Sequence, residues 1–170
     1  MSLDHVGPFP TQAPLAELER LCSAGDTTLY DAVGWQAAAR EFPFTGARVL
    51  AVQSKHGVDD RLHLDEPADL WILSGDSLRL ADGQLVPRTL GALRARYGRA
   101  IADDGVDGTS DDFNGFGARS CRLPYIEFKL GFSGHGIIPD STRITSLEMW
   151  IPVPRGTERI CATERRRDDR

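Results

Sequence analysis

Histidines and carboxylates gather in one stretch of the sequence, "HGVDDRLHLDEPAD", residues 56–69. Imidazole nitrogens and carboxylate oxygens are the ligands that catalytic zinc and iron sites use. His56 and His63 are seven residues apart, a spacing that places two side chains on one face of a helix, and Asp59 lies between them. One hypothesis is therefore a small metal-dependent hydrolase that uses His56, Asp59 and His63, with His135 as a fourth ligand.

The same stretch also fits a polar connection without a metal. Gly57 and Pro67 interrupt helices, and apolar, strand-like segments flank the stretch on both sides. In this interpretation the histidines and carboxylates are ordinary residues of a surface loop. The sequence favours the loop and leaves the metal hypothesis open.

A second oxygen-rich segment is "DDGVDGTSDDFNG", residues 103–115. Its aspartates alternate with glycines, and such flexible carboxylate loops bind calcium; the ligands would be Asp104, Asp107 and Asp111. The spacing departs from the frame of an EF-hand and lacks the glutamate at its twelfth position. A solvated connector is the favoured interpretation, with calcium or zinc as the only cofactors left open.

Other catalytic signatures do not fit. In "GFSGHG", residues 131–136, Ser133 and His135 lie close together, but the glycines are out of frame for a nucleophile elbow. The sequence contains no phosphate-binding loop and no dinucleotide fingerprint. We therefore expect a protein that is not an enzyme.

Length and charge bound the class of protein. The 170 residues suffice for one ordinary domain, and 41% hydrophobic with 26% charged residues are globular values. The net charge of −5 disfavours a nucleic-acid partner, which requires a basic face. The one dense basic run lies at 164–170 and is balanced by aspartates, so we expect a flexible tail over 155–170.

The cysteines leave the redox state open. Cys22, Cys121 and Cys161 match no zinc-binding spacing. Cys22 and Cys121 fall in ordered segments, which makes this pair the disulfide candidate; three buried free thiols are the alternative. No apolar run is long enough to span a membrane, and residues 1–10 show no signal peptide.

Two short helices are predicted from leucine spacing. In the segment 14–23, Leu15, Leu18, Leu21 and Cys22 form one apolar stripe after Pro14. The segment 89–98 starts at a Thr N-cap, ends at Gly98 and carries a stripe of its own, made by Leu90, Leu93 and Tyr97. Helices of about three turns are unstable alone, so both must pack on other elements.

Strand patterns supply those elements. Strands are predicted at 27–33, 47–54 and 68–75, in a hairpin over 76–86 that turns at Asp82-Gly83, and in "ARSCRL", "YIEFKLGF" and "RITSLEMWIPV". Each helix thus precedes a group of strands. We predict a single α+β domain over 1–170, with two short helices packed on antiparallel sheet and two related halves at 8–80 and 81–154.

The aromatic residues divide into core and surface candidates. Trp71 and Trp150 lie in strand patterns typical of a sheet core. Trp35 stands beside Gly34 and before small residues, which favours exposure. On the concave face of the sheet, Tyr30, Trp35 and Tyr125 would anchor a protein partner.

The helix-then-strands order resembles the tandem-repeat architecture of the β-lactamase inhibitor protein and of outer-membrane assembly lipoproteins. The matching segments are "VGPFPTQAPLAELERLC" and "GQLVPRTLGALRARYG". The strand Pro67–Leu73 is similar to a "PADxWIL" strand of uncharacterised secreted bacterial proteins. The resemblance implies a non-catalytic binding or inhibitor-like module, periplasmic or secreted, that acts on another protein.

Overall fold

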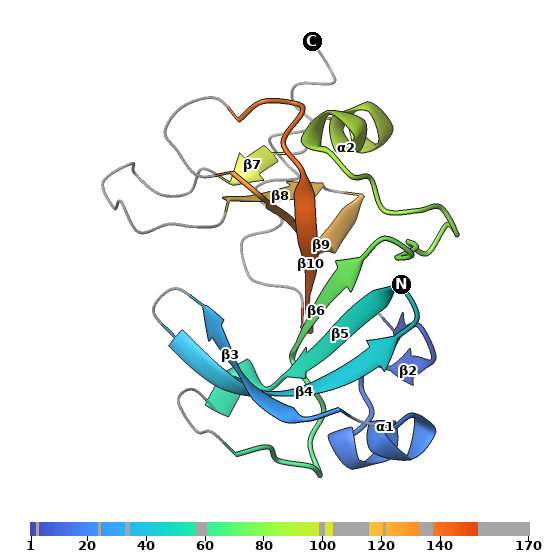
Figure 1. Ribbon diagram of the computed structural model, residues 1–170, viewed down its shortest axis with the longest axis vertical. Coiled ribbons are helices and arrows are strands. Elements are labelled where there is room, and N and C mark those ends of the chain that lie inside the picture. Colours follow the sequence, from blue (N-terminus) through green and yellow to red (C-terminus); the bar gives the residue numbers. More distant parts are fainter. Residues whose placement is uncertain are drawn as a thin grey trace. The chain divides into compact units, whose positions relative to one another are not determined.

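The computed structural model describes residues 1–2, 4–23, 25–32, 35–56, 61–98, 101–103, 116–120, 122–132 and 138–152 (Figure 1). Side chains are described within these ranges except at 32, 35, 101–103 and 116. The chain divides into two compact units, Met1–Val86 with Met149–Ile151, and Pro87–Glu148 with Pro152–Arg170.

The first unit consists of a small hairpin, one helix and a four-stranded antiparallel sheet. The hairpin pairs β1 (His5–Val6) with β2 (Phe9–Pro10), and α1 (Leu15–Leu21) follows. The sheet has the order β3-β4-β5-β6, so each strand pairs with the next one along the chain. Its strands are β3 (Thr27–Ala32), β4 (Trp35–Phe44), β5 (Ala47–Val52) and β6 (Leu70–Gly75), with the 3-10 turn η1 (Ser54–His56) after β5.

The first amides of helix α1 donate hydrogen bonds to backbone carbonyls outside the helix. Pro14 supplies no side-chain cap, but Leu15 N donates to Glu66 O at 3.0 Å and Ala16 N donates to Leu64 O at 2.9 Å. These bonds satisfy amides that a helix start leaves unpaired. They also attach the helix to the segment between β5 and β6.

The predicted stripe of α1 is correct at two positions and wrong at a third. Leu15 and Leu18 are fully buried, whereas Leu21 is 56% exposed. At 100° per residue, Leu21 lies 60° further round the helix than Leu18 and 120° from Leu15, at the margin of the buried face. Cys22 follows the last helical residue as its C-cap.

Both faces of the first unit's sheet are packed. On the helix side, Phe9 of the hairpin contacts Phe42 and Trp71, with ring centroids 4.7 and 6.1 Å apart. The opposite face carries a buried apolar cluster, against which Tyr30 and Trp150 pack: Ala37, Ala39, Leu50, Val52, Leu70 and Ile72. Burial confirms the core assignment of Trp71, which is fully buried.

The second unit repeats the order of one helix and four strands. Helix α2 (Leu90–Tyr97) precedes β7 (Ile101–Asp103), β8 (Phe116–Ser120), β9 (Leu123–Leu130) and β10 (Ile144–Trp150). The strand order is β10-β9-β8-β7, and the β7–β8 and β8–β9 pairs are antiparallel. The last residues of β10, from Met149 on, are counted with the first unit.

The start of α2 matches the prediction. The hydroxyl of Thr89 accepts a hydrogen bond from Ala92 N at 3.2 Å, and Leu90 and Leu93 are buried. As in α1, the first helical amides donate outside the helix: Leu90 N to Thr142 O at 2.9 Å, and Gly91 N to Asp140 O at 2.8 Å.

The sheet of the second unit carries a network of charged side chains, in which two glutamates are buried and Arg119 and Lys129 are half-buried. Glu127 of β9 accepts hydrogen bonds from Arg119 Nε at 2.9 Å and from Lys129 Nζ at 2.8 Å, and Lys129 also pairs with Glu148 at 3.3 Å. Burial opposes ionisation of Glu127, but Lys129 and Arg119 outweigh it and lower its pKa. The pKa of Lys129 is raised by Glu127 and Glu148 against the opposing effect of burial.

The fold class is thus strand-rich α+β, as predicted: two short helices with antiparallel sheet. The predicted hairpin over 76–86 is reduced to a turn at Gly83 and one bridge between Arg79 and Leu85. Within the described ranges, no helix is both long enough and apolar enough to cross a membrane.

Candidate functional site

The connection between β5 and β6 carries the candidate site, and the buried Gln53 holds its far end in place. Gln53 is 1% exposed. Its Nε2 donates to His63 O at 2.8 Å, and its Oε1 accepts a hydrogen bond from His63 N at 2.8 Å. Because an amide can form both bonds at once, Gln53 fixes the backbone position of His63.

Asp69 fixes the near end of the same connection. Its Oδ1 accepts from Ser54 N at 2.7 Å, and its Oδ2 accepts from Ser54 Oγ at 2.6 Å and from Lys55 N at 3.1 Å. These bonds cap η1, the turn that ends with His56. Asp69 is therefore a structural cap, and the backbone on either side of the connection is held by side chains.

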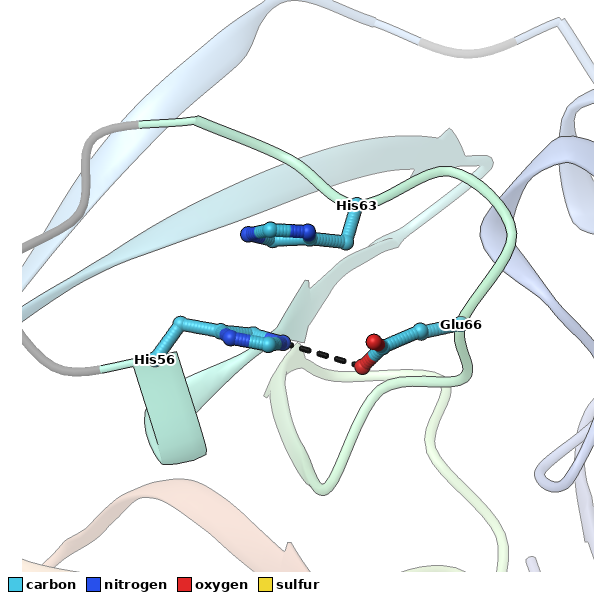
Figure 2. A group of neighbouring side chains, drawn as sticks. All are labelled: His56, His63 and Glu66. Atoms are coloured by element: carbon cyan, nitrogen blue, oxygen red, sulfur yellow. Dashed lines mark hydrogen bonds and ion pairs between the residues drawn. The ribbon is translucent and has the colours of Figure 1, made fainter.

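His56, His63 and Glu66 converge between these two anchors (Figure 2). His56 Nε2 lies 2.9 Å from Glu66 Oε2. The two imidazole rings stack with centroids 3.9 Å apart and an angle of 19° between their planes. One ligand atom from each of the three residues lies within 4.8 Å of the other two, and all three side chains are half-buried.

The electrostatics of the site centre on Glu66. The ammonium group of Lys55 and the imidazole of His56 both contact Glu66 Oε2. The hydrogen bond from Lys55, with that from His56, lowers the pKa of Glu66 to about 2. Glu66 is therefore an anion throughout the physiological pH range and offers its oxygens to cations.

Two imidazoles and one carboxylate are a donor set of the catalytic zinc type, which leaves further coordination positions open. The sequence hypothesis placed His56 and His63 in this set, and the structure brings these two together. Asp59, its third member, lies outside the described residues. Glu66 takes the place of a third ligand. A local turn, in which Glu66 N donates to His63 O, places it beside His63, and the bonds of Gln53 and Asp69 across the loop bring both residues to His56.

Other sequence-predicted residues fall outside the described ranges. They are Asp104, Asp107, Asp111, Ser133, His135, Cys121 and Cys161, with the predicted tail from 155 on. Cys22 is half-buried. With Cys121 not described, the Cys22–Cys121 disulfide stays a prediction, as does the calcium hypothesis.

Two of the predicted partner anchors, Tyr30 and Tyr125, have described side chains, and both are half-buried. Tyr30 packs against the buried apolar cluster of the first unit, and burial raises the pKa of the half-buried Tyr125 in the second. The side chain of Trp35 is outside the described set. The face that carries Tyr30 is filled within the chain, so it is not an open concave surface.

The β3 edge is one accessible part of the first unit's sheet. Within the described residues, β3 pairs only with β4. Every second residue of β3 is exposed, namely Thr27, Leu29 and Asp31, and Leu29 is 51% exposed. An unpaired strand edge presents a row of backbone donors and acceptors that another strand can use.

Comparison with known proteins shows the fold alone. No family model matches the sequence, and no curated protein matches it. The structure is similar to that of the uncharacterised protein YfeY from Escherichia coli, with a TM-score of 0.50 and 10% sequence identity. The similarity covers 88% of this chain and 98% of YfeY.

Proposed function

We propose that this chain is a non-catalytic protein-binding module that binds by strand addition at the β3 edge. The observation that carries the proposal is the exposed Leu29 in the middle of a strand that, among the described residues, pairs with β4 alone. Proteins usually protect such edges with lysines, prolines or bulges. None of these occurs in Thr27–Ala32, whose six residues all pair in register with β4.

The partner that the strand fits is a second copy of itself. In an antiparallel pair centred on Leu29, the two copies of Leu29 face each other, and Thr27 faces the second copy's Asp31. Arg40 lies beside Thr27 on β4 and its Nη1 donates to Thr27 Oγ1 at 2.9 Å. The arrangement therefore covers two exposed leucines. It also places each Asp31 opposite a Thr27 that accepts a hydrogen bond from Arg40.

Sedimentation velocity at increasing concentration tests this function. A single strand pair buries little area, so we expect a weak dimer that forms between about 10 and 500 µM, the range in which small interfaces associate. Leu29→Lys sets two ammonium groups opposite each other and should abolish the dimer. Leu85→Lys is the matched control, since Leu85 is 46% exposed and lies outside β3.

A monomer at every concentration would refute the strand-addition function. A dimer that persists in Leu29→Lys, or that is lost equally in Leu85→Lys, would show that another surface associates.

A small metal-dependent hydrolase is the alternative function, and one observation favours it. The hydrolase hypothesis requires His56 and His63 to meet, and their rings do stack. Hydrolysis of a chromogenic ester that requires Zn²⁺ and disappears in His63→Ala would support this alternative over the binding module.

The proposal includes the relation of the two units as copies of one helix-plus-sheet repeat. The amides of Leu15 and Leu90, 75 residues apart, both donate to the connection before the last strand of their unit. Leu18 and Leu93 keep the same separation and are both buried. Leu18→Ala and Leu93→Ala should each destabilise their own unit by about 2–5 kcal/mol; a loss in only one of them would contradict the equivalence.

A further inference from the structure

We propose that His56, His63 and Glu66 form a binding site for one divalent transition-metal ion, with Zn²⁺ as the best fit. The inference concerns the β5–β6 connection and is independent of binding at the β3 edge. Three features support it: the donor atoms, their separation, and the rigidity of the backbone that carries them.

The donor atoms select the class of metal. Imidazole nitrogen binds zinc, copper and nickel, whereas calcium and magnesium take oxygen ligands. Two of the three donors here are imidazoles, and the third is a carboxylate. The remaining coordination positions would be taken by water.

The separation of the donors requires only side-chain movement. Zinc bonds of about 2.0–2.2 Å at tetrahedral angles put ligand atoms roughly 3.3–3.5 Å apart. His56 Nε2 and Glu66 Oε2 are 2.9 Å apart, and the full set lies within 4.8 Å. Because the imidazole planes are nearly parallel, their lone pairs do not yet converge, and one ring must rotate (Figure 2).

The backbone under these side chains is held on both sides. Gln53 binds both backbone groups of His63, Asp69 caps the turn that ends at His56, and Glu66 N donates to His63 O at 3.0 Å. Ligands on fixed backbone lose little conformational entropy when the metal binds.

Lys55 is the competitor of the metal. Its ammonium group occupies Glu66 Oε2, the oxygen that also faces His56. A divalent ion must displace this ammonium group or take the other oxygen, so the metal and Lys55 oppose each other. The competition gives the proposal a test with a gain of affinity.

The experiment is calorimetric titration of the tag-free, reduced full chain with ZnCl₂, with the visible spectrum of the Co²⁺ form as second readout. We expect one ion per chain and a Co²⁺ spectrum typical of nitrogen and oxygen ligands. His63→Ala and Glu66→Gln should each weaken Zn²⁺ at least tenfold, the loss expected for a ligand. Lys55→Met should bind Zn²⁺ more tightly than the parent chain. His5→Ala, which changes an exposed histidine of β1, should leave binding unchanged.

Several results would overturn the site. They are no binding of Zn²⁺, binding that survives in His63→Ala, and a thiolate-to-Co²⁺ band, which would assign the ion to cysteines. Should circular dichroism show that the ligand variants do not fold, Lys55→Met decides the question. Lys55 is exposed, so its replacement leaves the fold intact, and the affinity of the variant protein for Zn²⁺ must rise. Unchanged or weaker binding in Lys55→Met would leave the cluster as an ion pair that fixes the loop.

Discussion

Substitution of Gly75 by alanine should destabilise the first unit more than the same change at the other described glycines of its turns. Gly75 ends β6 with φ +131°, a conformation that side chains other than glycine rarely adopt. A Cβ atom there would lie 2.3 Å from Gly46 O and 2.6 Å from Ala47 Cα. Both are backbone atoms, one in the turn between β4 and β5 and the other at the start of β5, so neither can rotate away.

The size of the effect follows from two costs. A strained backbone conformation costs about 1–3 kcal/mol, and forcing an atom into packed surroundings costs a further 1–3 kcal/mol or so. We expect a loss of about 4 kcal/mol, or roughly 8–16 °C in Tm for a chain of this size. Gly83→Ala is the matched control: its φ is +77° but nothing lies within 4 Å, so about 1 kcal/mol is expected.

Tryptophan fluorescence during urea unfolding measures this difference in the correct unit. Trp35, Trp71 and Trp150 all belong to the first unit, so the emission follows its unfolding. Equal losses in Gly75→Ala and Gly83→Ala would refute the reasoning, because the backbone clash distinguishes the two sites. A changed slope with denaturant, at unchanged midpoint, would mean that the unfolded state had been altered instead.

Three further predictions concern the second unit. Glu127→Gln leaves the half-buried Arg119 and Lys129 with too little negative charge. Unfolding followed by far-UV circular dichroism should show that the free energy of unfolding falls by about 3 kcal/mol, near the lower limit for breaking a buried pair since Glu148 remains. A loss below about 0.5 kcal/mol, as for exposed pairs, would contradict the network. The pKa of Glu127 is lowered, so its contribution to stability is present above its ordinary pKa of 4.5 and is lost as acid protonates it. The pKa of Lys129 is raised, so its contribution to stability is present below its ordinary pKa of 10.5 and is lost at higher pH. The free energy of unfolding should therefore fall at low pH and at high pH. The fall at low pH should be smaller in Glu127→Gln than in the unsubstituted protein; equal falls in the two proteins would contradict the assignment. Thr89→Ala removes the N-cap of α2 and should cost about 1 kcal/mol, while Thr89→Ser should retain most of it.

Leucine spacing was sufficient to predict both helices. The predicted segments 14–23 and 89–98 contain α1 and α2, because a buried stripe every three to four residues fits few other structures. Strands with alternating or β-branched residues were also predicted, as in β9 and β10, where Ile126, Phe128 and Leu147 are buried.

The longest strand, β4, was not predicted. Its sequence "WQAAAREFPF" is rich in alanine, which has low strand propensity, and contains a proline. In the structure the three alanines at 37–39 are buried, because the sheet is packed on both faces and small side chains fit at its centre. Such a strand forms because of the strands that pair with it, and the local sequence pattern does not indicate those strands.

The candidate site was predicted only in part for a similar reason. The spacing of His56 and His63 suggested a shared helix face, but the two meet across a loop. Glu66 joins them because Gln53 and Asp69 close that loop from its two ends. Local periodicity contains no information about these bonds, which only the folded connection shows.

The assignment of Met149–Ile151 to the first unit has a consequence for how the chain is made. Trp150 packs on the apolar cluster of that unit, and Ile151 N donates to Asp69 O at 2.9 Å. Residues 87–148 of the second unit are therefore inserted within the sequence of the first, and the ribosome must complete them before the first unit receives its last strand segment. A nascent chain that ends at Val86 leaves the apolar cluster uncovered on its Trp150 side. The first unit therefore completes its packing only after residues 149–151 have been synthesised.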